Sequence, residues 1–142
     1  MRSMSSAKHK SRQIAMQILF AWDVLGEANA EAGGHIAEGG NDDAAICRRA
    51  VEMAAAAWDK REATDQWVVR LAPQWPTRRQ AGVDRALLRL AVWELTSTDT
   101  PPKVVLDEAI ELAKQFSTEQ SPSFINGVLD AVLREHQARP VG

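Results

Sequence analysis

The chain has 142 residues, 45% of them hydrophobic and 25% charged, which fits one soluble globular domain with a core of its own. It lacks the run of ~18 apolar residues that a membrane span needs, and no apolar secretory stretch follows its basic N-terminus. A single cysteine excludes an internal disulfide. We therefore expect one domain over residues 1–142, in a reducing cytoplasm and without a membrane partner.

Charge is distributed unevenly along the chain. The first twelve residues hold no acid and five basic or titratable side chains, namely Arg2, Lys8, His9, Lys10 and Arg12. The rest holds 13 Lys and Arg residues against 19 Asp and Glu residues, a balance of −6 within a net charge of −2. A basic arm, residues 1–12, on an acidic body predicts a local contact with a polyanion. A solubilising terminus is the alternative, which we favour only for Arg2.

The first predicted helix covers residues 7–25 and stops at Gly26. Its possible N-caps are Ser3, Ser5 and Ser6. Its apolar side, which should face the core, consists of Ile14, Ala15, Ile18, Ala21, Trp22 and Leu25. The opposite side consists of His9, Arg12, Gln13, Met16, Gln17, Phe20 and Val24. An aromatic ring beside arginine and glutamine, as at Phe20, is typical of a base-stacking platform, although the sequence alone favours packing against another helix.

Residues 26–43 contain five glycines and predict a flexible Gly-rich loop, with room for a short helix near residues 31–38. These glycines do not form a phosphate-binding loop, because no strand precedes them and no Gly-Lys-Ser/Thr follows.

Two further helices are predicted before the middle of the chain. Asp42 and Asp43 can cap the first, whose apolar side holds Ile46, Ala50, Met53, Ala54, Ala57 and Trp58. The second is short, covers residues 64–71 and ends before Pro73. Residues 77–80 then form a basic turn, which we interpret as solvated surface.

Three amphipathic helices are predicted within residues 83–133. Pro101-Pro102 separates the first from the second, and Ser121-Pro122 opens the third, with serine as N-cap and proline at the first helical position. Apolar residues recur at helical spacing in all three and no segment alternates as a strand does, so the fold class is all-α. In the third helix, Asn126-Gly127 is unusual. It predicts either a close helix contact or the approach of a bound backbone or base.

Residues able to perform catalysis or hold a metal are scattered. The three histidines and Cys47 lack metal-ligand spacing, and no serine elbow, P-loop or dinucleotide fingerprint occurs. Glu108 and Glu111 lie three residues apart, which an exposed acidic helix face explains better than acid–base catalysis. We therefore expect no enzyme activity, no metal and no cofactor.

A long ordered motif carries a resemblance to a known family. The segment FSTEQSPSFINGVLD from Phe116 to Asp130, with VDRALLRLAVWEL at 83–95 and SRQIAMQILFAWDV at 11–24, resembles the bacterial NusB transcription antitermination family. The match spans nearly the whole chain and is weakest over residues 26–76. It implies an all-α domain of about seven helices in two small packed bundles. It also implies binding of single-stranded boxA RNA of ribosomal RNA leader transcripts. The implied partners are the ribosomal protein NusE and the antitermination complex of RNA polymerase.

The resemblance also implies roles for individual residues. The RNA-facing positions carried over onto this sequence are Lys8, His9, Lys10, Arg12, Gln17, Phe20, Arg89, Phe116, Gln120 and Phe124. Asp84 is the candidate for binding the ribosomal protein. Where the family has an arginine cluster, this chain has Lys-His-Lys-Ser-Arg, which loses bidentate phosphate geometry and adds a pH-sensitive group. Gln120 replaces an aspartate of some members, which should favour RNA binding.

Two alternatives remain open at this point. The diluted arginine cluster is compatible with a helical protein-interaction adaptor, possible as a homodimer, in which RNA binding is weakened. A NusB-like module also occurs in ribosomal RNA cytosine methyltransferases. That interpretation needs an S-adenosylmethionine domain, for which 142 residues leave no room.

Overall fold

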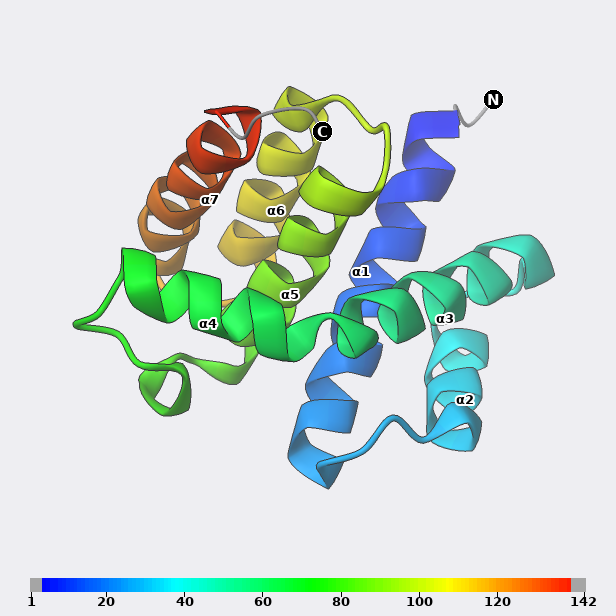
Figure 1. The fold of residues 1–142 in the computed structure, drawn as a ribbon. Coiled ribbons are helices and arrows are strands. Elements are labelled where there is room, and N and C mark those ends of the chain that lie inside the picture. The colour runs from blue at the N-terminus through cyan, green and yellow to red at the C-terminus, as the bar shows by residue number, and fades with distance from the viewer. Residues whose placement is uncertain (1–3, 139–142) are drawn as a thin grey trace.

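Residues 4–138 are described by the computed structural model and form seven α-helices and no strand (Figure 1). The helices are α1 (Met4–Leu25), α2 (Ala30–Gly40), α3 (Ala44–Asp59), α4 (Arg61–Leu71), α5 (Gly82–Ser97), α6 (Pro102–Phe116) and α7 (Ser121–Ala138). A 3-10 turn, η1 (Thr77–Arg79), lies between α4 and α5. None of these helices is long and apolar enough to cross a membrane. The predicted all-α fold is confirmed, while Arg2 and Ser3 lie outside the described residues.

The helices form two groups that α1 joins. α1 packs against α2 and α3 and also against α5, whereas α5, α6 and α7 pack together as the second group (Figure 1). α4 crosses the front of Figure 1 and packs against α5 and α7. Buried side chains from both groups meet in one hydrophobic core. The prediction of two small packed bundles is confirmed.

α1 is buried on more sides than its sequence pattern predicts. Arg12 and Met16, which we expected on the polar side, are only 5% and 2% exposed. Leu25, which we expected in the core, is 55% exposed. The reason is that α3 and α5 both cover α1, so this helix has no single buried stripe. Leu25 lies beyond that cover, directly before Gly26, whose φ of 80° ends the helix.

The Gly-rich segment contains a complete helix rather than a loop. α2 runs from Ala30 to Gly40, so the predicted short helix is confirmed and is longer than expected. Its N-cap is Asn29, whose side chain accepts a hydrogen bond from the backbone N–H of Ala32 at 2.9 Å. Gly33 faces α1, where an added Cβ would lie 3.0 Å from Cζ2 of Trp22. The absence of a side chain at Gly33 therefore lets α2 approach α1 closely.

Of the predicted N-caps, Asp43 is confirmed, whereas Ser5 and Ser6 lie within α1, which begins at Met4, and Ser121 is not a cap. Asp43 caps α3 by accepting a hydrogen bond from the backbone N–H of Ala45 at 2.9 Å. Ser121 does not cap α7, because this residue is already helical and its hydroxyl donates to Asp84 at 2.9 Å. The predicted N-cap at Ser121 is therefore wrong, and its side chain instead links α7 to α5.

Candidate nucleic-acid interface

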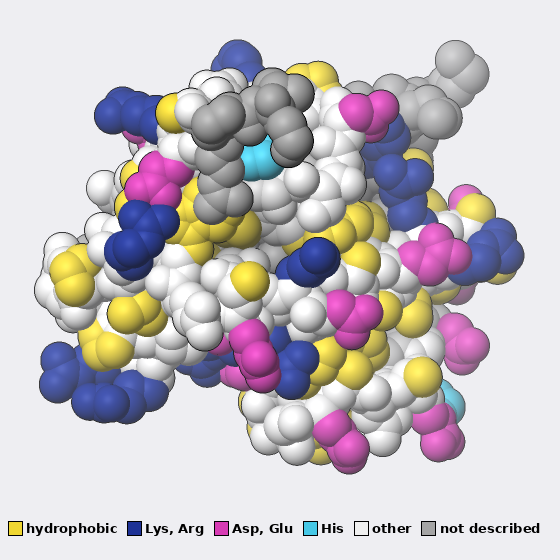
Figure 2. All heavy atoms as spheres, in the orientation of Figure 1, with side chains coloured by type: hydrophobic (Ala, Val, Ile, Leu, Met, Phe, Trp, Pro, Cys, Tyr) yellow, Lys and Arg dark blue, Asp and Glu magenta, His cyan; other side chains and the backbone are white. Residues whose placement is uncertain are grey.

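The predicted basic arm presents two lysines to solvent. Lys8 is exposed and Lys10 is half-buried, and neither forms an ion pair within residues 4–138. The ring of His9 contacts the carboxylate of Glu108 on α6 through Nδ1. Figure 2 shows acidic and basic side chains mixed over the face that it draws, without one continuous basic patch. Contact with a polyanion would therefore depend on a few individual cationic side chains, and not on the electrostatic field of a large basic surface.

Arg12 is the buried member of the arm. Its Nε and Nη2 donate to the carboxylate of Glu94 at 3.0 and 2.6 Å. Burial favours the neutral guanidine, but the hydrogen bonds and charge of Glu94, with the charge of Glu108, outweigh it and raise the pKa of Arg12. We correct the prediction accordingly: Arg12 is a permanent structural cation that joins α1 to α5, and it does not face solvent.

Arg89 is likewise enclosed. It is 6% exposed, and its Nε and Nη2 donate to Asp65 at 3.0 and 2.7 Å while its Nη1 donates to Asp23 at 3.0 Å. Arg85 also donates to Asp23, so two arginines and two aspartates join α1, α4 and α5. Burial works to raise the pKa of Asp23, but the two guanidiniums outweigh it and lower that pKa. The predicted contact of Arg89 with RNA would require breaking these ion pairs, so we correct it to a structural role.

The C-terminal part of α1 leaves apolar side chains in solvent. Phe20 is 41% exposed, Val24 73% and Leu25 55%, and we call these three residues the α1 apolar patch. The ring of Phe20 also covers the start of α5, where a Cβ added to Gly82 would lie 2.6 Å from it. Phe20 is therefore packed against α5, as the sequence favours, and is open on one side, while its base-stacking role stays a prediction. Gln17, one turn earlier, is half-buried.

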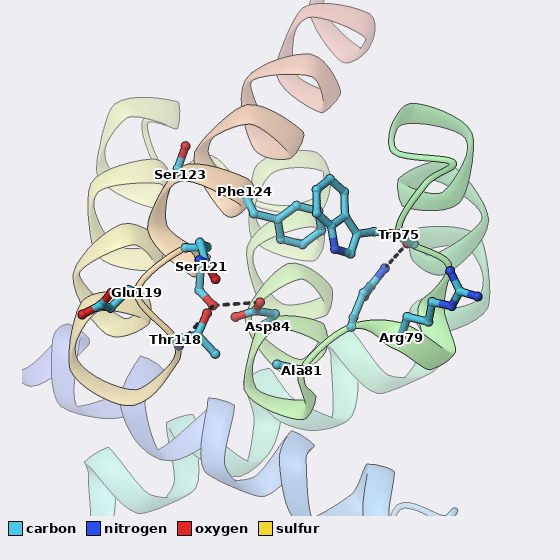
Figure 3. A pocket seen from close by; sticks show the side chains of 11 residues that line it. Trp75, Arg79, Ala81, Asp84, Thr118, Glu119, Ser121, Ser123 and Phe124 are labelled. Carbon is cyan, nitrogen blue, oxygen red and sulfur yellow. Dashed lines mark hydrogen bonds between the residues drawn. The ribbon is translucent and has the colours of Figure 1, made fainter.

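A groove lies between the η1–α5 segment and the α6–α7 turn (Figure 3). Its volume is about 670 Å³, and we call it the aromatic groove. Two of its wall residues, Gln120 and Phe124, are among the predicted RNA-facing positions. The ring of Phe124 packs against the indole of Trp75, with centroids 5.5 Å apart and planes tilted by 51°. The groove is thus bordered by an aromatic pair and by polar side chains.

Asp84 lies at the floor of this groove and does not project from the surface. It is 6% exposed and accepts hydrogen bonds from the hydroxyls of Ser117 at 2.6 Å and Ser121 at 2.9 Å. These bonds fix the α6–α7 turn against α5. Phe116, the last residue of α6, is half-buried against the core beside this turn. An influence of Asp84 on a partner would therefore act through the shape of the turn.

Trp75 is a functional candidate that the sequence reasoning missed, and Arg79 is one that we interpreted as solvated surface. Both line the aromatic groove, together with Gln120 and Phe124. A signal was present, because Trp75 stands between Pro73 and Pro76, where no helical periodicity offers a buried face. A large aromatic residue in such a connector predicts exposed apolar surface, which marks interaction sites.

Asn126 and Gly127 are both exposed on α7. A Cβ added to Gly127 would meet no atom within 4 Å, so the predicted close helix contact is wrong. The approach of a bound backbone or base remains a prediction for this position.

Comparison with known proteins places the chain among relatives of one kind. The model of the NusB family matches residues 9–134. The transcription antitermination protein NusB of Solibacter usitatus is 38% identical over 132 residues, covering 92% of this chain and 90% of that protein. The protein of the same name from Symbiobacterium thermophilum is 39% identical, covering 90% of each chain.

Solved structures agree with these relatives. NusB of T. maritima superimposes with a TM-score of 0.79 at 30% identity, covering 96% of this chain and 94% of that one. A structure of the antitermination factors NusB and NusE in complex with dsRNA gives a TM-score of 0.81 at 25% identity, covering 94% of this chain and 99% of the other.

Proposed function

The chain belongs to the NusB family, and from that premise we propose that it is a transcription antitermination factor that binds boxA RNA together with NusE. The observation that carries this proposal is the extent of the likeness, which includes α1 and the whole segment from α5 to α7. The similar NusB–NusE–RNA complex supports both partners. We propose a binding role without catalysis, exercised in the cytoplasm beside RNA polymerase.

We propose that the RNA surface starts at Lys8 and Lys10 of α1 and continues toward the α6–α7 turn. Lys8 and Lys10 would contact phosphates, and the exposed faces of aromatic residues would stack with bases. Support comes from the exposure of Lys8, Phe20 and Gln120 and the partial exposure of Lys10, Gln17, Phe116 and Phe124. Lys8 lies one residue before His9, whose contact with Glu108 joins this end of α1 to α6.

We propose that the end of the α1 apolar patch, Val24 and Leu25, is the surface for NusE, while Phe20 belongs to the proposed RNA surface. Exposed contiguous apolar side chains are typical of protein interfaces, and the acidic body would attract a basic ribosomal protein. The same patch supports the second candidate, a protein adaptor or homodimer with weakened RNA binding. The two candidates differ in whether RNA binds at all.

A titration of labelled boxA RNA, single-stranded and double-stranded, with and without NusE and at two salt concentrations tests the proposal. We expect NusE to raise RNA affinity, as linkage requires when the two bind cooperatively. The variant Lys8→Ala/Lys10→Ala should bind roughly tenfold more weakly, with a salt slope reduced by about 0.7 per lost phosphate contact. Its melting temperature should match that of the unaltered chain.

The matched control is Arg48→Ala/Arg49→Ala, which removes two adjacent exposed cations from α3. It should leave RNA affinity unchanged. Absence of RNA binding by the unaltered chain, with or without NusE at low salt, would overturn the proposal. Binding of NusE or a second copy without RNA would then favour the adaptor, and the mass of the complex would identify which.

A further inference from the structure

Trp75 is the most exposed tryptophan of the chain. It is 48% exposed, whereas Trp22 and Trp58 are 2% and 7% exposed and Trp67 and Trp93 are half-buried. Its indole packs against the ring of Phe124, and the rest of the indole is exposed to solvent at the rim of the aromatic groove (Figure 3). A tryptophan held in this way offers a flat apolar face to a ligand.

The connector that carries Trp75 is fixed in place. The side-chain amide of Gln80 donates to the backbone oxygen of Trp75 at 3.2 Å. Nη1 of Arg85 donates to the backbone oxygens of Thr77 at 2.7 Å and Gln80 at 3.2 Å. Because Arg85 is itself paired with Asp23, this wall of the groove is tied to α1. A pre-formed wall lowers the entropy lost when a ligand is ordered there.

Cationic side chains stand beside the tryptophan. Arg78 and Arg79 on η1 are exposed, and no ion pair or side-chain hydrogen bond joins either guanidinium to another residue between 4 and 138. In contrast, Arg12, Arg85 and Arg89 each donate to a carboxylate. Figure 2 shows a group of Lys and Arg side chains at the end of the molecule where η1 lies. These two charges are available to an anion.

We infer that the aromatic groove holds an unstacked base of single-stranded RNA, with Trp75 as its stacking face and Arg78 and Arg79 on the flanking phosphates. This inference rests on the proposed RNA binding and adds a subsite to it. A volume of about 670 Å³ accommodates a nucleobase. Aromatic and arginine planes bind bases without regard to sequence, because every base has a π-face.

The opposite wall of the groove determines on which side the RNA backbone would pass. Glu119 lines the groove on the side away from Arg79 (Figure 3). A carboxylate repels phosphate, so the RNA backbone would pass on the η1 side while the edge of the base points toward the α6–α7 turn. There Gln120 and Ser123 offer an amide and a hydroxyl for hydrogen bonds.

The test measures anisotropy of a labelled boxA RNA with single-stranded flanks on both sides, bound to the full chain in the presence of NusE. Trp75→Ala should weaken RNA binding about tenfold with an unchanged salt slope, because it removes stacking and no charge. Trp75→Phe, which keeps a ring, should stay within about threefold. Arg78→Ala/Arg79→Ala should weaken binding and lower the salt slope by about 0.7 per phosphate, whereas Arg48→Ala/Arg49→Ala should change neither.

Each result has a separate meaning. Unchanged affinity of Trp75→Ala, when the unaltered chain binds RNA, overturns the subsite and leaves the proposed function intact. Weaker binding of NusE to Trp75→Ala in the absence of RNA identifies the groove as a protein interface and also overturns the subsite. If the unaltered chain binds no RNA, both proposals fall. Thermal unfolding followed by circular dichroism separates loss of binding from loss of fold. If Trp75→Ala is unstable, the RNA affinity of Trp75→Phe tests the subsite in its place.

Discussion

Two cationic side chains on one face of α1, Lys8 and Arg12, take different roles. Lys8 reaches solvent, while Arg12, four positions later, is enclosed with Glu94 at 2.6 Å. A buried charge that loses its partner is costly, because the remaining ion stays desolvated. The two cations therefore differ in what their removal affects.

We expect Arg12→Ala to lower the free energy of unfolding by about 3 kcal/mol, since Glu94 would be left buried without its cation. Lys8→Ala should change it by less than about 0.5 kcal/mol. Urea unfolding of both variants measures the difference. The double variant Arg12→Ala/Glu94→Ala should lose less than the sum of the two single changes. Equal, small losses for Arg12→Ala and Lys8→Ala would contradict the structural role of Arg12.

At the scale of the element, α2 is a helix that holds four glycines, Gly33, Gly34, Gly39 and Gly40. Glycine lowers helix stability by about 1 kcal/mol relative to alanine, so this helix depends on packing against α1 and α3. Its glycines are not equivalent. Gly33 lies against Trp22, whereas a Cβ at Gly34 would meet no atom within 4 Å.

This contrast gives a matched pair of substitutions. Gly34→Ala should raise the free energy of unfolding by about 0.5–1 kcal/mol, because it restricts the unfolded chain without a new contact. Gly33→Ala should gain nothing or lose about 1 kcal/mol, because its Cβ would press on a fully buried indole. Thermal unfolding of the two variants decides the matter, and equal stabilisation by both would show that Trp22 can move aside.

The helical elements were largely predictable, and the exceptions have physical causes. Apolar spacing at 3.6 residues identified six of the seven helices, because that period reflects burial directly. Composition hid most of α2, since this glycine-rich helix depends on packing against α1 and α3. Ser121 carries the pattern of an N-cap, but Asp84, 37 positions earlier, takes its hydroxyl.

The candidate site was only partly predictable. The motif from Phe116 to Asp130 supplied Gln120 and Phe124, which both line the groove. It could not supply Trp75, because the connector reaches the groove through hydrogen bonds from Gln80 and Arg85. Nor could it reveal that Arg89 is neutralised by acids on two other helices. The local periodicity of a sequence does not predict ion pairs between segments that are far apart in the chain.

At the scale of the whole molecule, charged pairs join the two helix groups in addition to the shared hydrophobic core. Asp23 on α1 receives both Arg85 and Arg89 of α5, and Arg89 continues to Asp65 on α4. Because the pKa of Asp23 is lowered in the folded state, its ionised form stabilises the fold at pH above the unfolded value of about 3.9. This contribution is lost as pH falls through the lower folded pKa.

We therefore expect the unaltered chain to melt at a higher temperature than Asp23→Asn near neutral pH, by an amount corresponding to about 2 kcal/mol. This difference in melting temperature should be constant down to about pH 4. It should shrink at lower pH, as Asp23 becomes protonated in both the unfolded and the folded state. Melting temperatures from pH 7 to pH 2 measure it. A gap that persists unchanged at pH 2 would show that the charge of Asp23 is not its source.

The unequal exposure of the five tryptophans also gives the molecule a distinctive optical property. The chain contains no tyrosine, so its near-ultraviolet emission comes almost entirely from indole. Trp22 and Trp58 are shielded and stand edge to face with ring centroids 5.9 Å apart, while Trp75 meets water at the groove. Trp67 and Trp93 are half-buried, so Trp75 should make the largest single contribution to the red side of the emission band and to the part that iodide can quench. Without any added label, the chain carries its own optical reporter at the rim of the aromatic groove.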